Sequence, residues 1–104
     1  MSKVYLSGPM TGYPQFNYPA FNRIAESLTR IGFKVVNPVE ICSHLPQGSP
    51  WSDFMDVCLP AVAGSKKIYL LKGWEKSKGA RLELKEAIKH ELEIVQQGDF
   101  LSMP

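Results

Sequence analysis

Apolar residues along this chain follow two alternating patterns, short β-rich runs and longer stretches with helical spacing. Three runs are typical of buried strands, and each is soon followed by glycine or proline: Val4 to Leu6, Phe33 to Val36 and Ile68 to Leu71. A shorter run, Leu92 to Val95, predicts a fourth strand.

Between these runs, two stretches show a clear apolar helical face. The first follows Asn17, a good N-cap, and ends at Gly32, with its face formed by Phe21, Ile24, Ala25, Leu28 and Ile31. The other precedes the fourth strand, and its face is formed by Ala80, Leu84, Ala87, Ile88 and Glu91.

The middle of the chain has a weaker pattern. Residues 39–50 contain three turn-forming residues and no sustained period, which predicts a loop. A helix should begin near Trp51 or Ser52, with Ser49 or Ser52 as its cap. Pro60 removes a backbone hydrogen bond, so we expect a kink there or two short helices.

This alternation of strands and helices predicts an α/β fold. We expect a three-layer Rossmann-like or flavodoxin-like sandwich around a parallel sheet of four or five strands, with residues 1–104 as one domain. Open sheets of this kind bind ligands beyond the carboxyl ends of their strands. The glycine-bearing loops 7–12 and 73–79 follow two of these strands, so both should face one crevice.

Composition narrows the class of partner. A net charge of +2 is too small to indicate a polymeric nucleic acid. No apolar stretch approaches the ~20 residues that cross a bilayer, and the N-terminus has no signal-peptide pattern, so we expect a cytoplasmic protein. Cys42 and Cys58 fit neither a metal signature nor a disulfide scaffold; we expect two reduced thiols, no metal and no cofactor.

The first loop is a candidate binding segment. Its backbone amides and hydroxyls can meet an anion or a sugar, because glycine allows close approach: Ser7, Gly8, Pro9, Met10, Thr11 and Gly12. It matches neither a Walker loop nor the dinucleotide-binding fingerprint. A plain turn is the alternative interpretation.

The second loop and the helix after it carry the main candidates. Ser77 and the free N–H groups of the helix start near Gly79 form a plausible phosphate site. Glu83 lies about one turn further on and borders the apolar stripe, where a carboxylate could attack or stabilise a sugar carbon that develops positive charge. A simple response to the helix dipole would also explain Glu83. Trp74 could stack a base or pack into the core.

These motifs together resemble the nucleoside 2-deoxyribosyltransferase superfamily, over roughly residues 3–95. The similarity is to a small, DUF4406-like branch, often found in bacteriophages and prophages and usually left as a domain of unknown function. It lies in the first strand and loop, in residues 17–22 and 36–38, and in residues 71–83. The spacing of Ser77, Gly79 and Glu83 is also similar to that of the 2′-deoxynucleoside 5′-phosphate N-hydrolases.

The resemblance implies roles for these residues. Glu83 would attack or stabilise the anomeric carbon, Ser77 would bind the 5′-phosphate, and loop 7–12 would wrap the sugar and phosphate. The sequence departs from the family at its catalytic aspartate, where Cys58 stands, with Asp56 two residues earlier. Two residues turn a helical side chain by about 200°, so Asp56 could replace that aspartate only if the helix shifts or kinks. A solvated or capping role is the alternative for Asp56.

Three functions therefore remain open. The first is an N-glycosidase or deoxyribosyltransferase acting on a nucleoside or its 5′-monophosphate, with Glu83 and Asp56 as catalytic residues. The second is a non-catalytic nucleotide-binding phage protein that senses or sequesters a nucleotide. The third is an interaction domain that shares only the fold. The resemblance also implies a homodimer.

Overall fold

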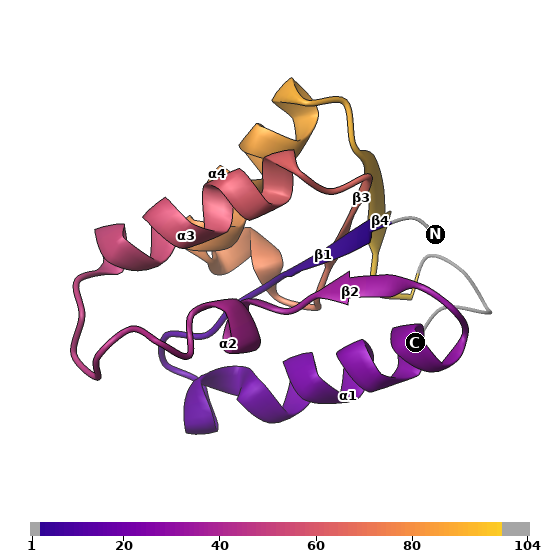
Figure 1. The fold of residues 1–104 in the computed structure, drawn as a ribbon. Helices are drawn as coiled ribbons and strands as arrows, with labels where there is room; N and C mark the ends of the chain where they lie inside the picture. The colour runs from indigo at the N-terminus through magenta and orange to yellow at the C-terminus, as the bar shows by residue number, and fades with distance from the viewer. Residues whose placement is uncertain (1–2, 99–104) are drawn as a thin grey trace.

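A four-stranded, all-parallel sheet forms the middle layer of the protein (Figure 1). The computed structural model describes residues 3–98. The strands are β1 (Lys3–Ser7), β2 (Lys34–Val36), β3 (Lys67–Leu70) and β4 (Glu93–Gln96), in the order β2-β1-β3-β4. The predicted three-layer α/β architecture is confirmed, with four strands rather than five in residues 3–98.

One face of the sheet is covered by α1 (Tyr18–Arg30), which lies below the strands in Figure 1. Phe21, Ile24 and Leu28 of α1 are buried, and they pack against Val4 and Leu6 of the central strand. Burying each such side chain stabilises the fold by about 1.5–3 kcal/mol. The predicted face of this helix is confirmed except at Ile31, which follows the helix and is exposed.

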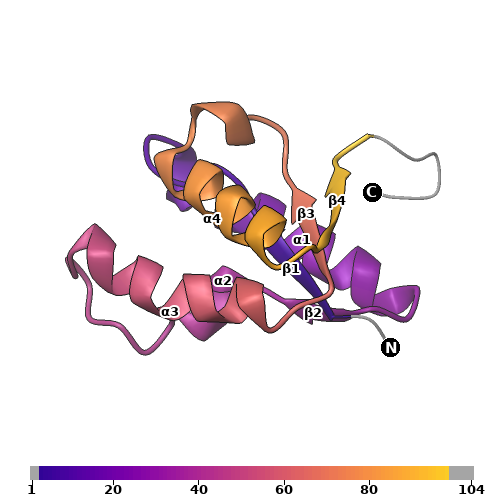
Figure 2. The ribbon, with the colours of Figure 1, turned by 90° about the horizontal axis from the view of Figure 1, so that it is seen from above.

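The opposite face is covered by α3 (Trp51–Ala63) and α4 (Lys78–Lys89), which lie side by side (Figure 2). Its core combines Tyr5 of β1 and Ile68 of β3 with Cys58 and Val62 of α3 and Ala87 of α4. The alternation of side chains along β1 therefore divides the molecule into two separate cores.

The predicted loop 39–50 is wrong at its start, where α2 (Pro38–Ile41) forms a short helix. The Oδ1 atom of Asn37 accepts a hydrogen bond from the N–H of Val39 and caps this turn, and Pro38 suits the first helical position. A single turn is too short to show a helical period, which is why the pattern did not predict it.

The helix α3 is continuous from Trp51 to Ala63, so the predicted division into two short helices at Pro60 is wrong. Packing of its buried face outweighs the one hydrogen bond that proline removes. Neither predicted serine caps it: Pro50 occupies the N-cap position, and the hydroxyl of Ser49 donates instead to the carbonyl of Pro46.

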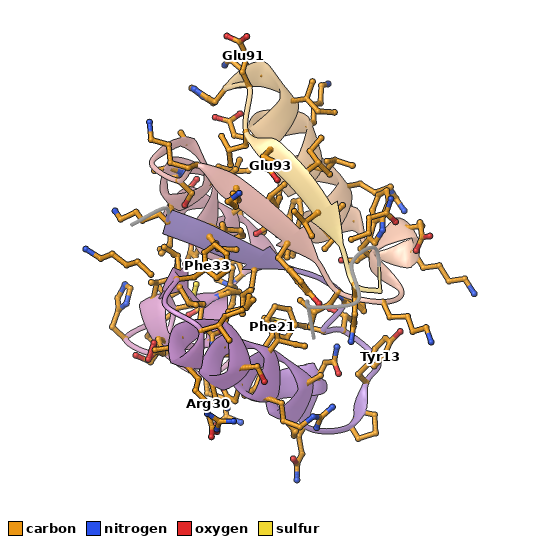
Figure 3. All side chains as sticks on the ribbon, turned by 90° about the vertical axis from the view of Figure 1, so that its right-hand side faces the viewer. Tyr13, Phe21, Arg30, Phe33, Glu91 and Glu93 are labelled. Atoms are coloured by element: carbon orange, nitrogen blue, oxygen red, sulfur yellow. The ribbon has the colours of Figure 1, made fainter. Side chains whose placement is uncertain are left out.

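Two other local predictions differ from the structure. Asn17 precedes α1 as expected, but its side chain donates to the carbonyl of Pro9 and so ties the helix start to the first loop. In α4 the buried positions are Ala80, Glu83 and Ala87, whereas Ile88 is 59% exposed. Glu91 lies beyond the helix and points away from the molecule (Figure 3).

The remaining helical turns are η1 (Pro14–Asn17), before α1, and η2 (Trp74–Lys76), before α4. Both follow loops that leave the carboxyl ends of β1 and β3. Among the helices of residues 3–98, none has the length and apolar character that crossing a bilayer requires.

Candidate functional site

The carboxyl group of Glu83 lies at the carboxyl end of β1, and the residue is only 5% exposed. Its Oε2 atom accepts a hydrogen bond of 2.6 Å from the hydroxyl of Tyr5, and its Oε1 atom accepts one of 2.6 Å from the hydroxyl of Ser7. Both donors are themselves fully buried. A buried acid is costly unless hydrogen bonds compensate it, and here each oxygen has its own donor.

The local sequence explains how these three groups meet. Tyr5 and Ser7 are two residues apart on β1, so their side chains leave the same face of the sheet. Glu83 lies between Ala80 and Ala87 on the buried face of α4. The small alanines let the helix approach the strand closely enough for the carboxyl group to reach both hydroxyls.

Two thiols extend this cluster towards α2 and α3. Cys58 of α3 is buried beside Tyr5 and Glu83, close enough to change the pKa of both side chains. Its sulfur lies 3.6 Å from that of Cys42, which ends α2 and is half-buried. Both cysteines are free, and residues 3–98 hold no group of three or more His, Cys, Asp or Glu residues suited to a metal ion.

The protonation of this cluster is set by burial and by its one acid. Burial raises the pKa of Glu83, while hydrogen bonds from Ser7, Tyr5 and Cys58 oppose that rise. Burial and then the charge of Glu83 raise the pKa of Tyr5 and of Cys58 far above their ordinary values. Glu83 is therefore the group that ionises first, and its two neighbours remain hydrogen-bond donors.

The two predicted binding loops do converge beside Glu83. A Cβ atom on Gly8 would lie 2.7 Å from the Cβ of Leu71, so the first loop passes the end of β3 at a distance that only glycine allows. A Cβ atom on Gly73, whose φ is +91°, would lie 2.7 Å from the hydroxyl of Tyr13. Tyr13 extends from the first loop at this end of the molecule (Figure 3).

Within the first loop, accessibility changes along the chain. Ser7 and Pro9 are buried, Gly8 and Met10 are half-buried, and Thr11 and Gly12 are exposed. The loop is closed by a hydrogen bond from the N–H of Tyr13 to the carbonyl of Met10. Its outer part, Thr11 and Gly12, is therefore the part that faces solvent.

The second loop uses several predicted residues structurally. The hydroxyl of Ser77 accepts a hydrogen bond of 3.1 Å from the N–H of Ala80 and so caps α4. Gly79 faces Met55 and Trp51 of α3, where a Cβ atom would lie 3.4 and 3.5 Å from their side chains. Trp74 is half-buried against the core, and its indole N–H donates to Gln96.

The two candidate acids lie in different surroundings. Glu83 is buried in the cluster, whereas Asp56 is exposed on α3. The buried position on that helix beside Glu83 belongs to Cys58. The structure thus brings Glu83 and Ser7 together and leaves Asp56 on the surface.

Tyr5 is the contact that sequence reasoning missed. It lies in a strand whose apolar run predicts only core. Its side chain nevertheless leaves the same face of the sheet as that of Ser7, and a buried hydroxyl requires a hydrogen-bond partner. That spacing could have indicated a shared polar partner.

Two surface hollows, of about 480 and 470 Å³, lie away from this cluster. One lies along α1 and β2, and the other lies along the outer face of α4.

Comparison with family models decides the affiliation of the chain. The model described as "Domain of unknown function (DUF4406)" matches residues 2–96. The chain belongs to this family. A comparison with curated proteins finds no match. The DUF4406 match covers the whole sheet, both loops and Glu83, so every part of the candidate site lies inside the family domain.

Proposed function

We propose that this DUF4406 protein cleaves, or transfers at, the N-glycosidic bond of a nucleoside or nucleoside 5′-monophosphate. The observation that carries the proposal is the buried Glu83 carboxyl group, held by Tyr5 and Ser7 at the carboxyl end of β1. Ligands bind beyond this edge of open parallel sheets. The resemblance to nucleoside 2-deoxyribosyltransferases supports the choice of substrate class.

In the proposed reaction, an oxygen of Glu83 attacks or electrostatically stabilises the anomeric carbon while its bond to the base nitrogen breaks. The electron pair of that bond passes to the base, which takes up a proton. Water, or a second base in a transfer reaction, then adds to the same carbon and frees Glu83. Each carboxylate oxygen has lone pairs beyond the one that accepts from Tyr5 or Ser7. A carboxylate oxygen can therefore interact with the anomeric carbon while both hydrogen bonds remain.

This chemistry requires the ionised form of Glu83. Burial favours the protonated acid, and the hydrogen bonds from Ser7, Tyr5 and Cys58 favour the carboxylate. Tyr5 and Ser7 therefore act as positioning residues: they orient the carboxylate and support its charge. Removing either donor should shift the acidic limb of the pH–rate profile to higher pH.

The remainder of the substrate would lie across the two loops. We assign the sugar and phosphate to Ser7–Gly12, whose outer part is exposed, and to the start of α4 at Ser77 and Gly79, where the helix dipole favours an anion. We assign the stacking of a base to Trp74, within the second loop, and to the exposed ring of Tyr13 beside Gly73.

Release of free base from a panel of nucleosides and nucleoside 5′-monophosphates tests the proposal. Glu83→Gln should reduce turnover by about 10²–10⁴-fold, because the amide cannot carry the required charge. Glu91→Gln is the matched control, since this exposed acid lies at the far end of the molecule from Tyr13 (Figure 3). Equal base release by wild type and Glu83→Gln would refute the enzymatic proposal.

A second function, nucleotide binding without turnover, is favoured by one observation. Cys58 occupies the buried position beside Glu83, and the nearest acid on α3, Asp56, is exposed. A thiol whose pKa is raised by burial is a poor proton donor to a leaving base. This alternative predicts a higher Tm with a nucleotide but no release of base.

We extend the proposal to the protein's assembly and location. We propose a homodimer in the cytoplasm, that of the bacterial host if the protein is phage-encoded. Light scattering coupled to size-exclusion chromatography tests the assembly, and a monomer at working concentration would contradict it.

A further inference from the structure

The pair of thiols next to Glu83 is a reactive part of this cluster that the proposed reaction does not use. Cys42 directly follows α2 and Cys58 lies on α3, 16 residues further along the chain, and their sulfurs are 3.6 Å apart. A disulfide requires about 2 Å between the sulfurs, so rotation of the two side chains and a small helix shift must bring them together.

We propose that Cys42 and Cys58 form a reversible disulfide under oxidation, and that this bond withdraws the Cys58 thiol from Glu83. The bond itself stands on the geometry of the two thiols. Its effect on catalysis rests on the function proposed above for Glu83.

The two cysteines differ in access. Cys42 is half-buried at the end of α2, whereas Cys58 is 3% exposed. A small oxidant such as a peroxide therefore reaches Cys42 first. Burial raises the pKa of both thiols, so the reaction depends on the small thiolate fraction and should be slow at neutral pH.

The chemistry balances with one peroxide. The thiolate of Cys42 attacks a peroxide oxygen, the O–O bond breaks, and hydroxide leaves and is protonated, which gives a sulfenic acid. The sulfur of Cys58 then attacks the sulfur of Cys42, the S–O bond breaks, and the hydroxyl leaves as water with the proton of Cys58. Two thiols and hydrogen peroxide become one disulfide and two waters.

The consequence reaches Glu83 because Cys58 lies buried beside it and lowers its pKa. The disulfide has no S–H proton, whereas the hydrogen bonds from Tyr5 and Ser7 to the carboxyl group remain. Loss of the thiol proton beside the charged form raises the pKa of Glu83 further. Oxidation should therefore lower the ionised fraction of Glu83 without closing or blocking the loops above it.

The test treats the reduced protein with hydrogen peroxide, alkylates the remaining thiols and measures intact mass and peptide maps. We expect loss of two hydrogen atoms, no alkylation at either cysteine, a Cys42–Cys58 linked peptide, and reversal by dithiothreitol. Tm should rise by roughly 5–15 °C on closing this loop. Full alkylation of both cysteines after peroxide, or oxidation of Cys42 to the sulfinic acid without the linked peptide, would overturn the proposal.

Variants separate the bond from its effect. Cys42→Ser should fold, form no intramolecular disulfide and keep its base release after peroxide, whereas wild type should lose activity at low pH and regain it with dithiothreitol. Phenylarsine oxide, which bridges adjacent thiols, should bind wild type and not Cys42→Ser. Absence of base release in both redox states would refute the proposed function alone, because the mass and arsenical measurements do not depend on turnover.

Discussion

The two faces of the sheet use the same strands for different purposes. Beneath α1, the core is built from apolar side chains such as Val4, Leu6, Phe21 and Leu28. Beneath α3 and α4, the core also holds the hydroxyl of Tyr5, a thiol and the carboxyl group of Glu83. In β1 the two kinds of residue alternate along one short strand.

This contrast separates stability from chemistry. The α1 face, whose core also buries Tyr69 of β3 with its hydroxyl group, gains mainly from apolar burial, which is non-directional and tolerant of substitution by similar side chains. The α4 face accepts the cost of burying polar groups, and in residues 3–98 it compensates that cost with specific hydrogen bonds, leaving no buried polar side-chain atom without a partner. A site that must keep a carboxylate oriented requires the second arrangement.

Truncating a buried side chain on the apolar face should have the largest effect on stability. Phe21→Ala removes a fully buried ring that touches the sheet (Figure 3), and should lower the free energy of unfolding by about 3–5 kcal/mol in urea titrations. Ile31→Ala, at the exposed position just after the same helix, should change it by less than about 0.5 kcal/mol. Equal losses in the two variants would show that α1 is not held by this core.

Removing a hydrogen bond from the polar face should lower the free energy of unfolding by less. Ser7→Ala deletes the donor to Oε1 of Glu83 and should lower the free energy of unfolding by about 1.5–3 kcal/mol where Glu83 is ionised. The matched control is Ser65→Ala, because the buried hydroxyl of Ser65, which lies just after α3, donates to the neutral backbone carbonyl of Ala61, and its loss should cost about 0.5–1.5 kcal/mol. If the Ser7 variant is no less stable than the control, the hydroxyl contributes nothing to the carboxylate.

The polar face should also make stability depend on pH. Burial raises the folded-state pKa of Glu83 above its ordinary value of 4.5. Its stabilising contribution is therefore complete below that pH and is lost as the pH rises through the folded-state pKa. The side chain in Glu83→Gln does not ionise. The free energy of unfolding of this variant should therefore increase relative to that of wild type as the pH rises, by about 1.4 kcal/mol per unit of pKa shift. Parallel stability curves from acid to neutral pH would contradict the raised pKa.

Substitutions outside both cores should have the smallest effects on the free energy of unfolding. Glu26 and Arg30 form a 2.6 Å ion pair on the outer surface of α1, and both side chains are about 70% exposed. Glu26→Gln should therefore cost only about 0.3–0.5 kcal/mol, and less at high salt. A loss as large as that of Ser7→Ala would mean that the division between the two faces is less sharp than the structure indicates.

Local pattern predicted most of the fold. The runs around β1, β3 and β4 and the periodicity of α1 were enough to give a four-stranded parallel α/β sandwich, because burial on a sheet or helix imposes a regular spacing. The short helix α2 was not predicted, and α3 continues through Pro60, where the sequence left open a kink or two short helices. One turn carries no period, and the cost of Pro60 could be weighed only against packing that the sequence does not display.

By itself, the sequence determined the order along the chain of the four strands and the three longer helices, and it pointed to Glu83 and to the two glycine-bearing loops, since these depend on spacing along a few neighbouring residues. Tertiary structure decided what Glu83 touches. Its partners Tyr5 and Ser7 are 78 and 76 residues away, and Cys58 meets Cys42 from another helix. Such contacts follow from β1 lying at the centre of the sheet and from the close approach of α4, which are properties of the packed chain rather than of any local pattern.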